Sequence, residues 1–315
     1  MVFQLDVQRY QLEYVAQTEG QFPHYAGSMW RGAWGHALKR TVCITRLPQC
    51  EHCLLRGQCV YSQLFETPAG REPLLGKINH APHPYSIHPL ATSGASFSQG
   101  ALLTIGLTLI GHAHQQLSYL LYAFEQLGRH GLGKAQARLQ LHAVYQESAL
   151  GEQDWQLIYQ PDMSLKALPP SELLIPSAPS RVQLTWLTPY RAQYQERLLK
   201  PAHFTPDVLV MGLVRRISLL AAYWGQAWSG MDELIPALQQ AASTLRLEQS
   251  TLYWQAWSRF SNRQQRLVQM DGMMGSVVLS GEGLTTVWPW LWFGQWVQVG
   301  KGTVMGLGAY RLEAV

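Results

Sequence analysis

The order of the strands and helices that the sequence predicts limits the possible fold more than any other feature. Phe3–Gln17 alternates apolar and polar residues, which is typical of a strand. Ser28–Thr41 has apolar residues three and four positions apart and is predicted to be a helix. Ala101–His112 follows as an apolar strand, Gln115–Leu127 as a helix that ends at glycines, and Ala135–Tyr145 as a strand. With one more strand in the weakly patterned stretch before Ala101, the order is strand, helix, strand, strand, helix, strand.

The same order returns after a proline-rich segment. Five prolines stand between Pro161 and Pro179, which is typical of a linker. The elements predicted after it are the strand Arg181–Leu187, the helices Pro206–Trp224 and Met231–Ala242, the strands Thr251–Phe260 and Met273–Leu279 with a basic, Gln-rich turn between them, the helix Thr286–Trp296 and the strand Gly308–Leu312. The ferredoxin-like fold has this order of elements. We therefore predict an α+β protein of two tandem ferredoxin-like (RRM-like) domains, at residues 1–160 and 181–315, joined by a linker at 161–180.

Composition and charge exclude several classes of protein. Hydrophobic residues make up 47% of the chain and charged residues 14%, so extended disorder is not expected. The apolar runs are shorter than the ~20 residues of a membrane-spanning helix, and the first residues show no basic stretch followed by an apolar one. We expect a cytoplasmic protein with no membrane partner. The net charge of +4 permits a nucleic-acid partner, and Arg259, Arg263 and Arg266 stand in a short run without an acid.

All four cysteines stand in one short segment, residues 43–59, which we call the cysteine segment. They are Cys43, Cys50, Cys53 and Cys59. In a chain without a secretion signal, thiols at this spacing favour a tetrahedral metal site over disulfides. We predict one structural zinc ion inserted in the first domain, with an iron–sulfur cluster as the alternative and four free or paired cysteines as the plain interpretation. A closed four-thiolate site has no position for substrate, so we expect no catalytic metal there.

A second unusual run, residues 300–308, is rich in glycine and is called the glycine loop. It contains Gly300, Lys301, Gly302, Gly306 and Gly308. Glycines leave backbone N–H groups free to face an anion, and Lys301 adds a positive charge. The run lacks the spacing of a P-loop and the helix that follows a dinucleotide-binding fingerprint. By itself the pattern indicates a turn more often than a phosphate site.

Segments near both ends of the chain carry a distinctive combination of motifs. Near the C-terminal end they are residues 273–281 (MMGSVVLSG), 288–294 (WPWLWFG) and 297–311 (VQVGKGTVMGLGAYR). Near the front, residues 30–40 (WRGAWGHALKR) precede the four cysteines and Phe65–Glu66. Together these segments resemble the CRISPR repeat-processing endoribonucleases of the Cas6 family, in the branch with four cysteines. The resemblance covers parts of both predicted domains, whereas the middle of the chain is too variable to compare.

The resemblance implies an endoribonuclease that cuts CRISPR repeat RNA in the precursor transcript and so generates guide crRNA. It implies cleavage without a catalytic metal, by attack of a 2′-OH on the adjacent phosphate, which leaves a 2′,3′-cyclic phosphate. Such chemistry needs a base, an acid and a cation. His36 is the predicted proton-transfer residue, because an imidazole titrates near neutral pH and Lys39 and Arg40 share its helix face. Tyr25 or His24 is the predicted second proton group.

The expected partner is CRISPR repeat RNA or crRNA, with other Cas proteins of an effector complex as further partners. The residues predicted to bind RNA are Arg31, Arg40, Arg259, Arg263, Arg266, Gly300, Lys301, Gly302, Gly306 and Gly308. Two alternatives stay open at this point. One is a non-catalytic crRNA-binding subunit of a CRISPR effector complex, and the other is a redox or iron–sulfur protein unrelated to RNA.

Overall fold

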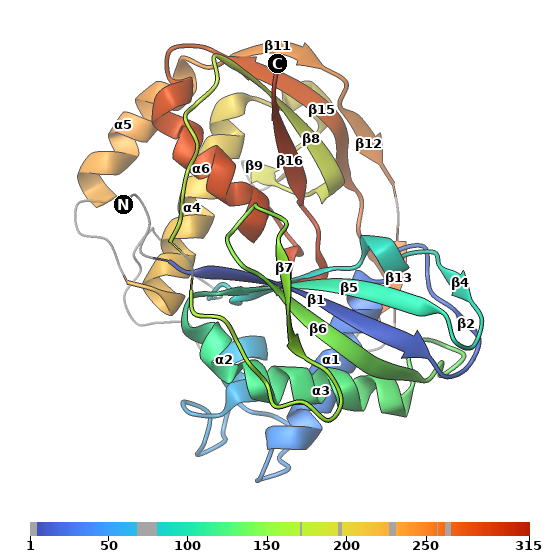
Figure 1. Cartoon of the computed structure of the whole chain (residues 1–315). Helices are drawn as coiled ribbons and strands as arrows, with labels where there is room; N and C mark the ends of the chain where they lie inside the picture. The colour runs from blue at the N-terminus through green and yellow to red at the C-terminus, as the bar shows by residue number, and fades with distance from the viewer. Residues whose placement is uncertain are drawn as a thin grey trace. The chain divides into compact units, whose positions relative to one another are not determined.

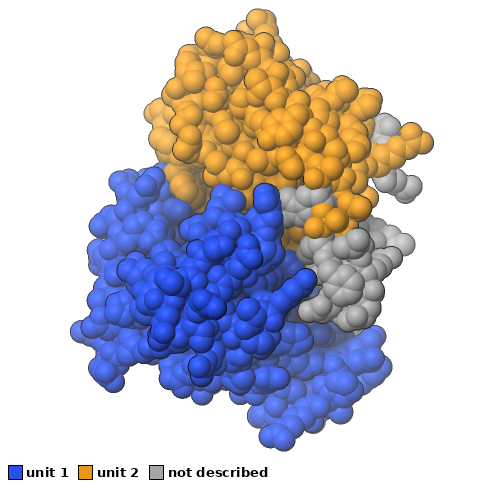
Figure 2. All heavy atoms as spheres, turned by 90° about the vertical axis from the view of Figure 1, so that its right-hand side faces the viewer, with its two compact units in different colours: residues 1, 3–174, 219–227 blue, residues 2, 175–218, 228–315 orange. Residues whose placement is uncertain are grey.

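The chain folds into two compact units, as shown by a computed structural model (Figures 1 and 2). The structure describes residues 5–67, 81–170, 172–194, 197–226, 231–256, 258–261 and 266–315. Unit 1 consists mainly of residues 3–174 with 219–227, and unit 2 of residues 175–218 with 228–315. None of the described helices has the length and apolar character needed to cross a membrane.

Unit 1 is built on an antiparallel sheet with the strand order β3-β5-β1-β6-β7. Its strands are β1 (Val7–Ala16), β3 (Tyr85–His88), β5 (Leu102–Ile110), β6 (Leu139–Glu147) and β7 (Trp155–Tyr159). Helix α1 (Gly27–Val42) follows β1 in sequence, α3 (Leu117–His130) follows β5, and both cover the same face of the sheet (Figure 1). Apart from the added edge strand β7, this is the ferredoxin-like arrangement. The remaining elements of unit 1 are β2 (Gly20–Gln21), α2 (Val60–Phe65), β4 (Ser96–Phe97) and the 3₁₀ helices η1 (Leu90–Thr92) and η2 (Gly111–Gln116).

Buried aromatic side chains fix α1 in unit 1. Trp34 of α1 is fully buried and stacks on Phe124 of α3, with 4.7 Å between the ring centroids. Its indole N–H donates to the Leu120 carbonyl at 3.3 Å. The Tyr14 hydroxyl of β1 donates to the carbonyl of the same Phe124 at 3.1 Å, which joins the helix layer to the sheet. Because truncating a buried aromatic side chain costs about 3–5 kcal/mol, Trp34 determines which face of α1 stays open.

Unit 2 repeats the arrangement with the strand order β11-β15-β8-β16. Its sheet strands are β8 (Arg181–Tyr190), β11 (Arg246–Ser250), β15 (Gly272–Ser280) and β16 (Tyr310–Ala314), with β12 (Tyr253–Gln255) also paired to β15. The helices are α4 (Pro206–Trp224), α5 (Met231–Ser243), α6 (Leu284–Val297) and the 3₁₀ helices η3 (Pro201–His203) and η4 (Thr303–Met305). Two hairpins stand outside the sheet, β9 (Gln193–Tyr194) with β10 (Arg197–Leu198), and β13 (Ser258–Ser261) with β14 (Arg266–Gln269).

The prediction of two ferredoxin-like domains in tandem is confirmed, with differences in single elements. The strand predicted at 251–260 is two strands, because β12 pairs with β15 whereas β13 turns away to pair with β14. The sequence does not predict strand β11, since all its side chains are exposed and no apolar alternation marks it. Residues 43–59 form turns without a helix or strand and connect α1 to α2. Residues 166 and 168, in the predicted linker, hydrogen-bond to β7 and β6.

Candidate functional site

Helix α1 has one open face, and His36 lies on it. The buried face of the helix carries Trp34 and Leu38, whereas His36 and Arg40 are exposed. A Cβ atom at Gly32, one turn before His36, would meet no atom within 4 Å. Residues 32, 36 and 40 are four positions apart and therefore share one face of the helix. We call Gly32, His36 and Arg40 the α1 strip, which combines an imidazole, a guanidinium and open space for a substrate backbone.

Lys39 points to the cysteine segment, although its sequence position makes it a candidate partner of His36. Its ammonium donates to the Pro48 carbonyl at 3.0 Å and lies 5.3 Å from the centre of the Tyr61 ring. Arg40, in contrast, forms no ion pair or hydrogen bond within the described part of the chain. Arg40 is thus the better placed of the two cations to meet a phosphate beside His36.

Tyr25 stands just before α1 and at a distance from His36. Since α1 begins at Gly27 and rises 1.5 Å per residue, His36 is about 14 Å further along the helix axis. The Tyr25 side chain is half-buried, and this burial raises the pKa of its hydroxyl well above the usual value. A phenol in this state keeps its proton at neutral pH, and its raised pKa makes it a weaker proton donor than an exposed tyrosine. His24, the alternative second proton group, is exposed.

Arg31, predicted to bind RNA, is engaged inside unit 1. Its Nε donates to the Tyr85 hydroxyl at 3.2 Å, and its guanidinium lies 5.2 Å from the centre of the Phe65 ring. Burial raises the pKa of Tyr85 to about 12, although the charge of Arg31 acts in the opposite direction. These contacts hold α1 against β3 and α2, which gives Arg31 a structural role in this arrangement.

The four cysteines are free thiols that divide into two neighbourhoods, Cys43 with Cys53 and Cys50 with Cys59. The Thr45 hydroxyl lies 3.5 Å from the Cys53 sulfur and 4.0 Å from the Cys43 sulfur, whereas Cys50 is buried. The hydrogen bond with Thr45 and a backbone N–H lower the pKa of the Cys53 thiol, while burial and Glu66 raise that of Cys50. Within the described residues, no three His, Cys, Asp or Glu side chains are arranged to hold a metal ion. The four-cysteine metal centre therefore stays a prediction.

The glycine loop is shaped by two close backbone approaches. Gly300 and Gly308 have φ values of 88° and 72°, in the left-handed region that favours glycine. A Cβ at Gly300 would overlap the Arg191 carbonyl oxygen, and a Cβ at Gly308 would overlap that of Val299. These two glycines are therefore required by the fold of the loop itself.

Backbone amides of the loop are partly used within the protein. Gly306 N–H donates to the Thr303 carbonyl at 2.8 Å, and Gly308 N–H donates to the Pro189 carbonyl at 3.1 Å. These two amides do not face outward, contrary to the expectation that the loop glycines present their N–H groups to a phosphate. Lys301 is exposed, and its side chain forms no ion pair in the described part of unit 2. The Lys301 charge is thus the main feature that the loop offers to an anion.

The remaining predicted RNA contacts lie on the basic hairpin. Arg259 is in β13 and Arg266 is in β14, and the two strands pair with each other. Arg263 lies outside the described residues.

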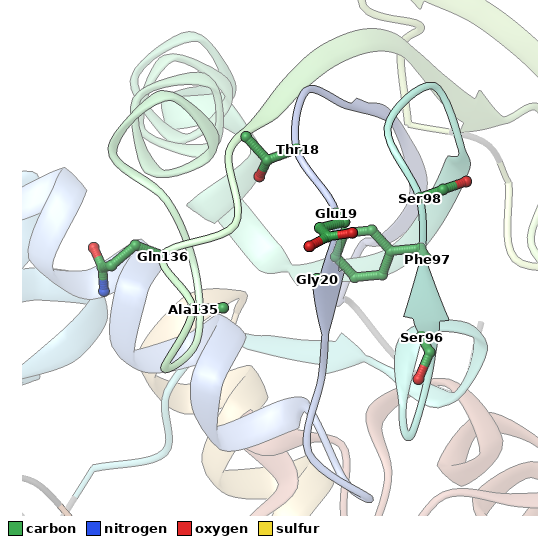
Figure 3. Close-up of a pocket in the computed structure, with 8 residues that line it drawn as sticks. All are labelled: Thr18, Glu19, Gly20, Ser96, Phe97, Ser98, Ala135 and Gln136. Atoms are coloured by element: carbon green, nitrogen blue, oxygen red, sulfur yellow. The ribbon is translucent and has the colours of Figure 1, made fainter.

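An open depression of about 750 Å³ lies in unit 1 beside the turn that follows the C-terminal end of β1 (Figure 3). Its lining residues come from the β1–β2 turn, from β4 and its flanks, and from the loop between α3 and β6; they are Thr18, Glu19, Gly20, Ser96, Phe97, Ser98, Ala135 and Gln136. It contains none of the residues predicted from the sequence to be catalytic or RNA-binding. The depression is therefore not part of the candidate site.

Sequence reasoning missed residues that act only through tertiary contacts in unit 2. Arg216 of α4 donates its Nε to the carbonyls of Val297 and Gln298, each at 2.9 Å, and so fixes the end of α6 just before the glycine loop. Burial lowers the pKa of Arg216 to about 10. The Lys200 ammonium lies 3.2 Å from the centre of the Trp254 ring. No local spacing marks either contact, since the partners are far apart in the sequence.

Two family models match most of the chain. AF_1859_N, described as an N-terminal domain, matches residues 5–172. The model of the CRISPR-associated endoribonuclease Cas6 matches residues 184–310. No curated protein sequence matches the chain.

Solved structures share the fold over the whole chain. The Cas6 (TTHB231) product complex has a TM-score of 0.60 at 16% identity, over 98% of this chain and 100% of that chain. Thermus thermophilus Cas6 (TTHB231) has a TM-score of 0.53 at 14% identity, over 98% and 99%. A partial Cas6-RT-Cas1–Cas2 complex has a TM-score of 0.58 at 15% identity, over 100% of this chain but 47% of that chain. Residues 184–310, in unit 2, thus carry the domain of the CRISPR-associated endoribonuclease Cas6 family, and the solved Cas6 structures share the fold of the chain.

Proposed function

We propose that this protein binds CRISPR repeat RNA in the precursor transcript and cleaves it to give guide crRNA. The observation that carries the proposal is the α1 strip, in which His36 and Arg40 stand exposed on one face beside the open position of Gly32. A histidine beside an arginine that has no acid partner among the described residues is suited to act on a phosphodiester, because the reaction moves protons and develops negative charge. The match of residues 184–310 to the model of the CRISPR-associated endoribonuclease Cas6 supports RNA as the substrate.

The proposed reaction needs no metal ion, because the nucleophile is the 2′-OH of the substrate. His36 takes the proton of this hydroxyl while the 2′-oxygen of the RNA forms a bond to phosphorus. The bond from phosphorus to the 5′-oxygen breaks, and the leaving oxygen receives a proton from Tyr25 or His24. The products are a 2′,3′-cyclic phosphate and a 5′-OH. Arg40 stabilises the charge on the phosphate oxygens, while Lys39 is proposed to support the site through its contact with the cysteine segment.

The decisive experiment is single-turnover cleavage of the repeat RNA from the protein's own locus, in EDTA, followed by analysis of the end groups. We expect cyclic phosphate and 5′-OH ends. His36→Ala should slow cleavage about 10²–10⁴-fold, with nearly unchanged RNA affinity. The matched control is His142→Ala, since His142 is also exposed in unit 1 but lies on β6.

Three outcomes would change the proposal. Cleavage by His36→Ala at the wild-type rate would move the catalytic role away from the α1 strip. Loss of cleavage in EDTA that zinc or magnesium restores would contradict the metal-independent route. Tight binding of the repeat without any cleavage would favour a non-catalytic crRNA-binding subunit of a CRISPR effector complex. Other Cas proteins are proposed as further partners, in line with the similar chain that stands in a Cas6-RT-Cas1–Cas2 complex.

A further inference from the structure

One end of the unit 2 sheet gathers cations and aromatic rings from four segments. Lys200 lies over Trp254 of β12, with 3.2 Å between the ammonium and the ring centroid. Leu199, the residue before Lys200, donates its N–H to the Ala192 carbonyl at 3.0 Å, which closes the base of the β9–β10 hairpin. Six of the basic and aromatic residues on these segments and on the adjoining loop are Arg191, Tyr194, Arg197, Lys200, Trp254 and Lys301. We call these six residues the cationic–aromatic surface.

Backbone contacts join the glycine loop to this surface. The Lys301 N–H donates to the Arg191 carbonyl at 2.7 Å, and the Arg191 side chain donates to the Gln269 carbonyl at the end of β14. Arg197 is paired with Tyr194 across the β9–β10 hairpin. The six residues therefore form a continuous region of unit 2 and are not isolated surface positions.

The four cations of this surface have no acidic partner among the described residues. None of them forms an ion pair in the part of unit 2 that the structure describes. Glu196, in the turn of the β9–β10 hairpin, lies outside the described residues. Four positive charges at one end of a sheet, with no paired carboxylate among the described residues, attract a polyanion. The surface thus has the charge that an RNA backbone requires.

The aromatic rings indicate which form of RNA fits. Tyr194 is 51% exposed and pairs with the cationic residue Arg197 across the β9–β10 hairpin. Exposed rings stack on unpaired bases, whereas an A-form duplex hides the faces of its bases. Trp254 already carries an ammonium on one ring face, and a flexible lysine can move from the ring to a phosphate when a base arrives. An acidic protein would use the charges but would not need the rings.

We propose that the cationic–aromatic surface binds an unpaired stretch of the RNA substrate, with Tyr194 and Trp254 stacking on bases and the four cations meeting phosphates. This inference rests on the proposed function, because it assigns a second contact of the same RNA. The inference requires that the RNA substrate has a few unpaired nucleotides in addition to the cleaved position. The α1 strip by itself does not require them.

The test measures affinity by fluorescence anisotropy, with His36→Ala as the background so that the RNA stays intact. One RNA is the locus repeat with its unpaired flanks, and the other has abasic residues in those flanks, so that the phosphates stay and the bases are removed. Tyr194→Ala should weaken binding of the first RNA about 5- to 100-fold and leave binding of the abasic RNA unchanged. Tyr194→Phe should restore affinity. Tyr119→Ala is the matched control, since Tyr119 is 52% exposed on α3 of unit 1.

Salt dependence tests the cations separately. Lys200→Ala should flatten the slope of log K against log salt by roughly 0.7 for each phosphate of a single strand that the lysine neutralises. Unchanged affinity and slope in both Tyr194→Ala and Lys200→Ala would overturn the inference. If Tyr194→Ala weakens the binding of both RNAs equally, base stacking is overturned. Base stacking is also overturned if polyglutamate displaces the repeat RNA as effectively as abasic RNA does. If the wild-type chain never cuts the repeat but Tyr194→Ala still weakens binding selectively, the cleavage proposal fails and this inference stands.

Discussion

Gly308→Ala is the substitution that most directly tests the role of the glycine loop. The new Cβ would overlap the Val299 carbonyl oxygen, in a backbone with φ of 72°. An alanine held in the left-handed region costs about 1–2 kcal/mol. If Gly308 moves away from Val299 to relieve this overlap, two backbone hydrogen bonds also weaken. They run from Val299 N–H to the Gly308 carbonyl, 3.2 Å, and from Gly308 N–H to the Pro189 carbonyl, 3.1 Å. Each such bond contributes about 0.5–1.5 kcal/mol.

The sum is a decrease of about 3 kcal/mol in the free energy of unfolding of unit 2, which corresponds to a fall of roughly 6–12 °C in its unfolding temperature. Scanning calorimetry measures this transition. Gly212→Ala is the matched control, because a Cβ at Gly212 of α4 would lie 3.7 Å from a Val299 methyl and 3.9 Å from the Tyr190 hydroxyl, which are ordinary contacts. Alanine stabilises a helix interior relative to glycine by up to about 1 kcal/mol. The two variants should therefore change stability in opposite directions.

Equal unfolding temperatures for Gly308→Ala and Gly212→Ala would refute the reasoning, since the two sites would then tolerate a methyl group equally. The RNA affinity of Gly308→Ala is a second measurement that tests the role of the glycine loop. Displacement of the loop should also displace Lys301, so Gly308→Ala should weaken RNA binding at temperatures where unit 2 is still folded. A destabilised variant with wild-type affinity would show that the loop is a structural turn without a role in binding.

Three further predictions concern other regions. Elemental analysis of freshly purified, reduced protein should find one zinc ion or one iron–sulfur cluster per chain, absent when Cys50 and Cys53 are both changed to Ser; wild-type protein without zinc or iron would contradict the four-thiolate site. Lys301→Ala should weaken binding of all RNA sequences alike and flatten the salt slope by roughly 0.7, whereas an unchanged slope would exclude a phosphate contact. Burial, with a smaller effect of Arg9, lowers the pKa of His88 to about 3, from 6.5. The unfolded chain therefore binds more protons between these values, and His88 reduces stability as the pH falls from about 6.5 toward 3. Unfolding titrations of His88→Gln should show a shallower decline of stability over this pH range, and a profile parallel to that of the wild type would contradict this.

The order of elements is predictable because it follows from local patterns. The spacing of Trp30, Trp34 and Leu38 marks the buried face of α1 before any tertiary contact is known. The observed bounds of helix α4 agree with the predicted ones for the same reason, since its apolar residues recur at helical spacing. Strand β11 and helix α2 escape prediction, the first because its side chains are all exposed and the second because six residues are too few to show a period.

The candidate site is predictable only in part. Sequence spacing places Lys39 and Arg40 equally close to His36, and only the contact of Lys39 with the Pro48 carbonyl separates their roles. The same limit applies to the glycine loop, where composition cannot tell an amide that faces solvent from one that bonds to Pro189. Arg191, Arg197 and Lys200 stand within ten residues of one another, whereas only the backbone contact with Arg191 joins Lys301 to them.

In both units the first sheet strand pairs with a strand that is made much later, and this has a consequence for folding during synthesis. Tyr10 of β1 pairs with Gln146 of β6, and Trp186 of β8 pairs with Tyr310 of β16. At translation rates of about 5–20 residues per second, β8 waits roughly 6–25 s for its last partner to be made. The sheet of unit 1 is then already complete, while the nascent unit 2 exposes an unpaired central strand to aggregation. Folding of this protein on the ribosome is therefore expected to be stepwise, with the glycine loop of unit 2 formed after helix α1 is in place.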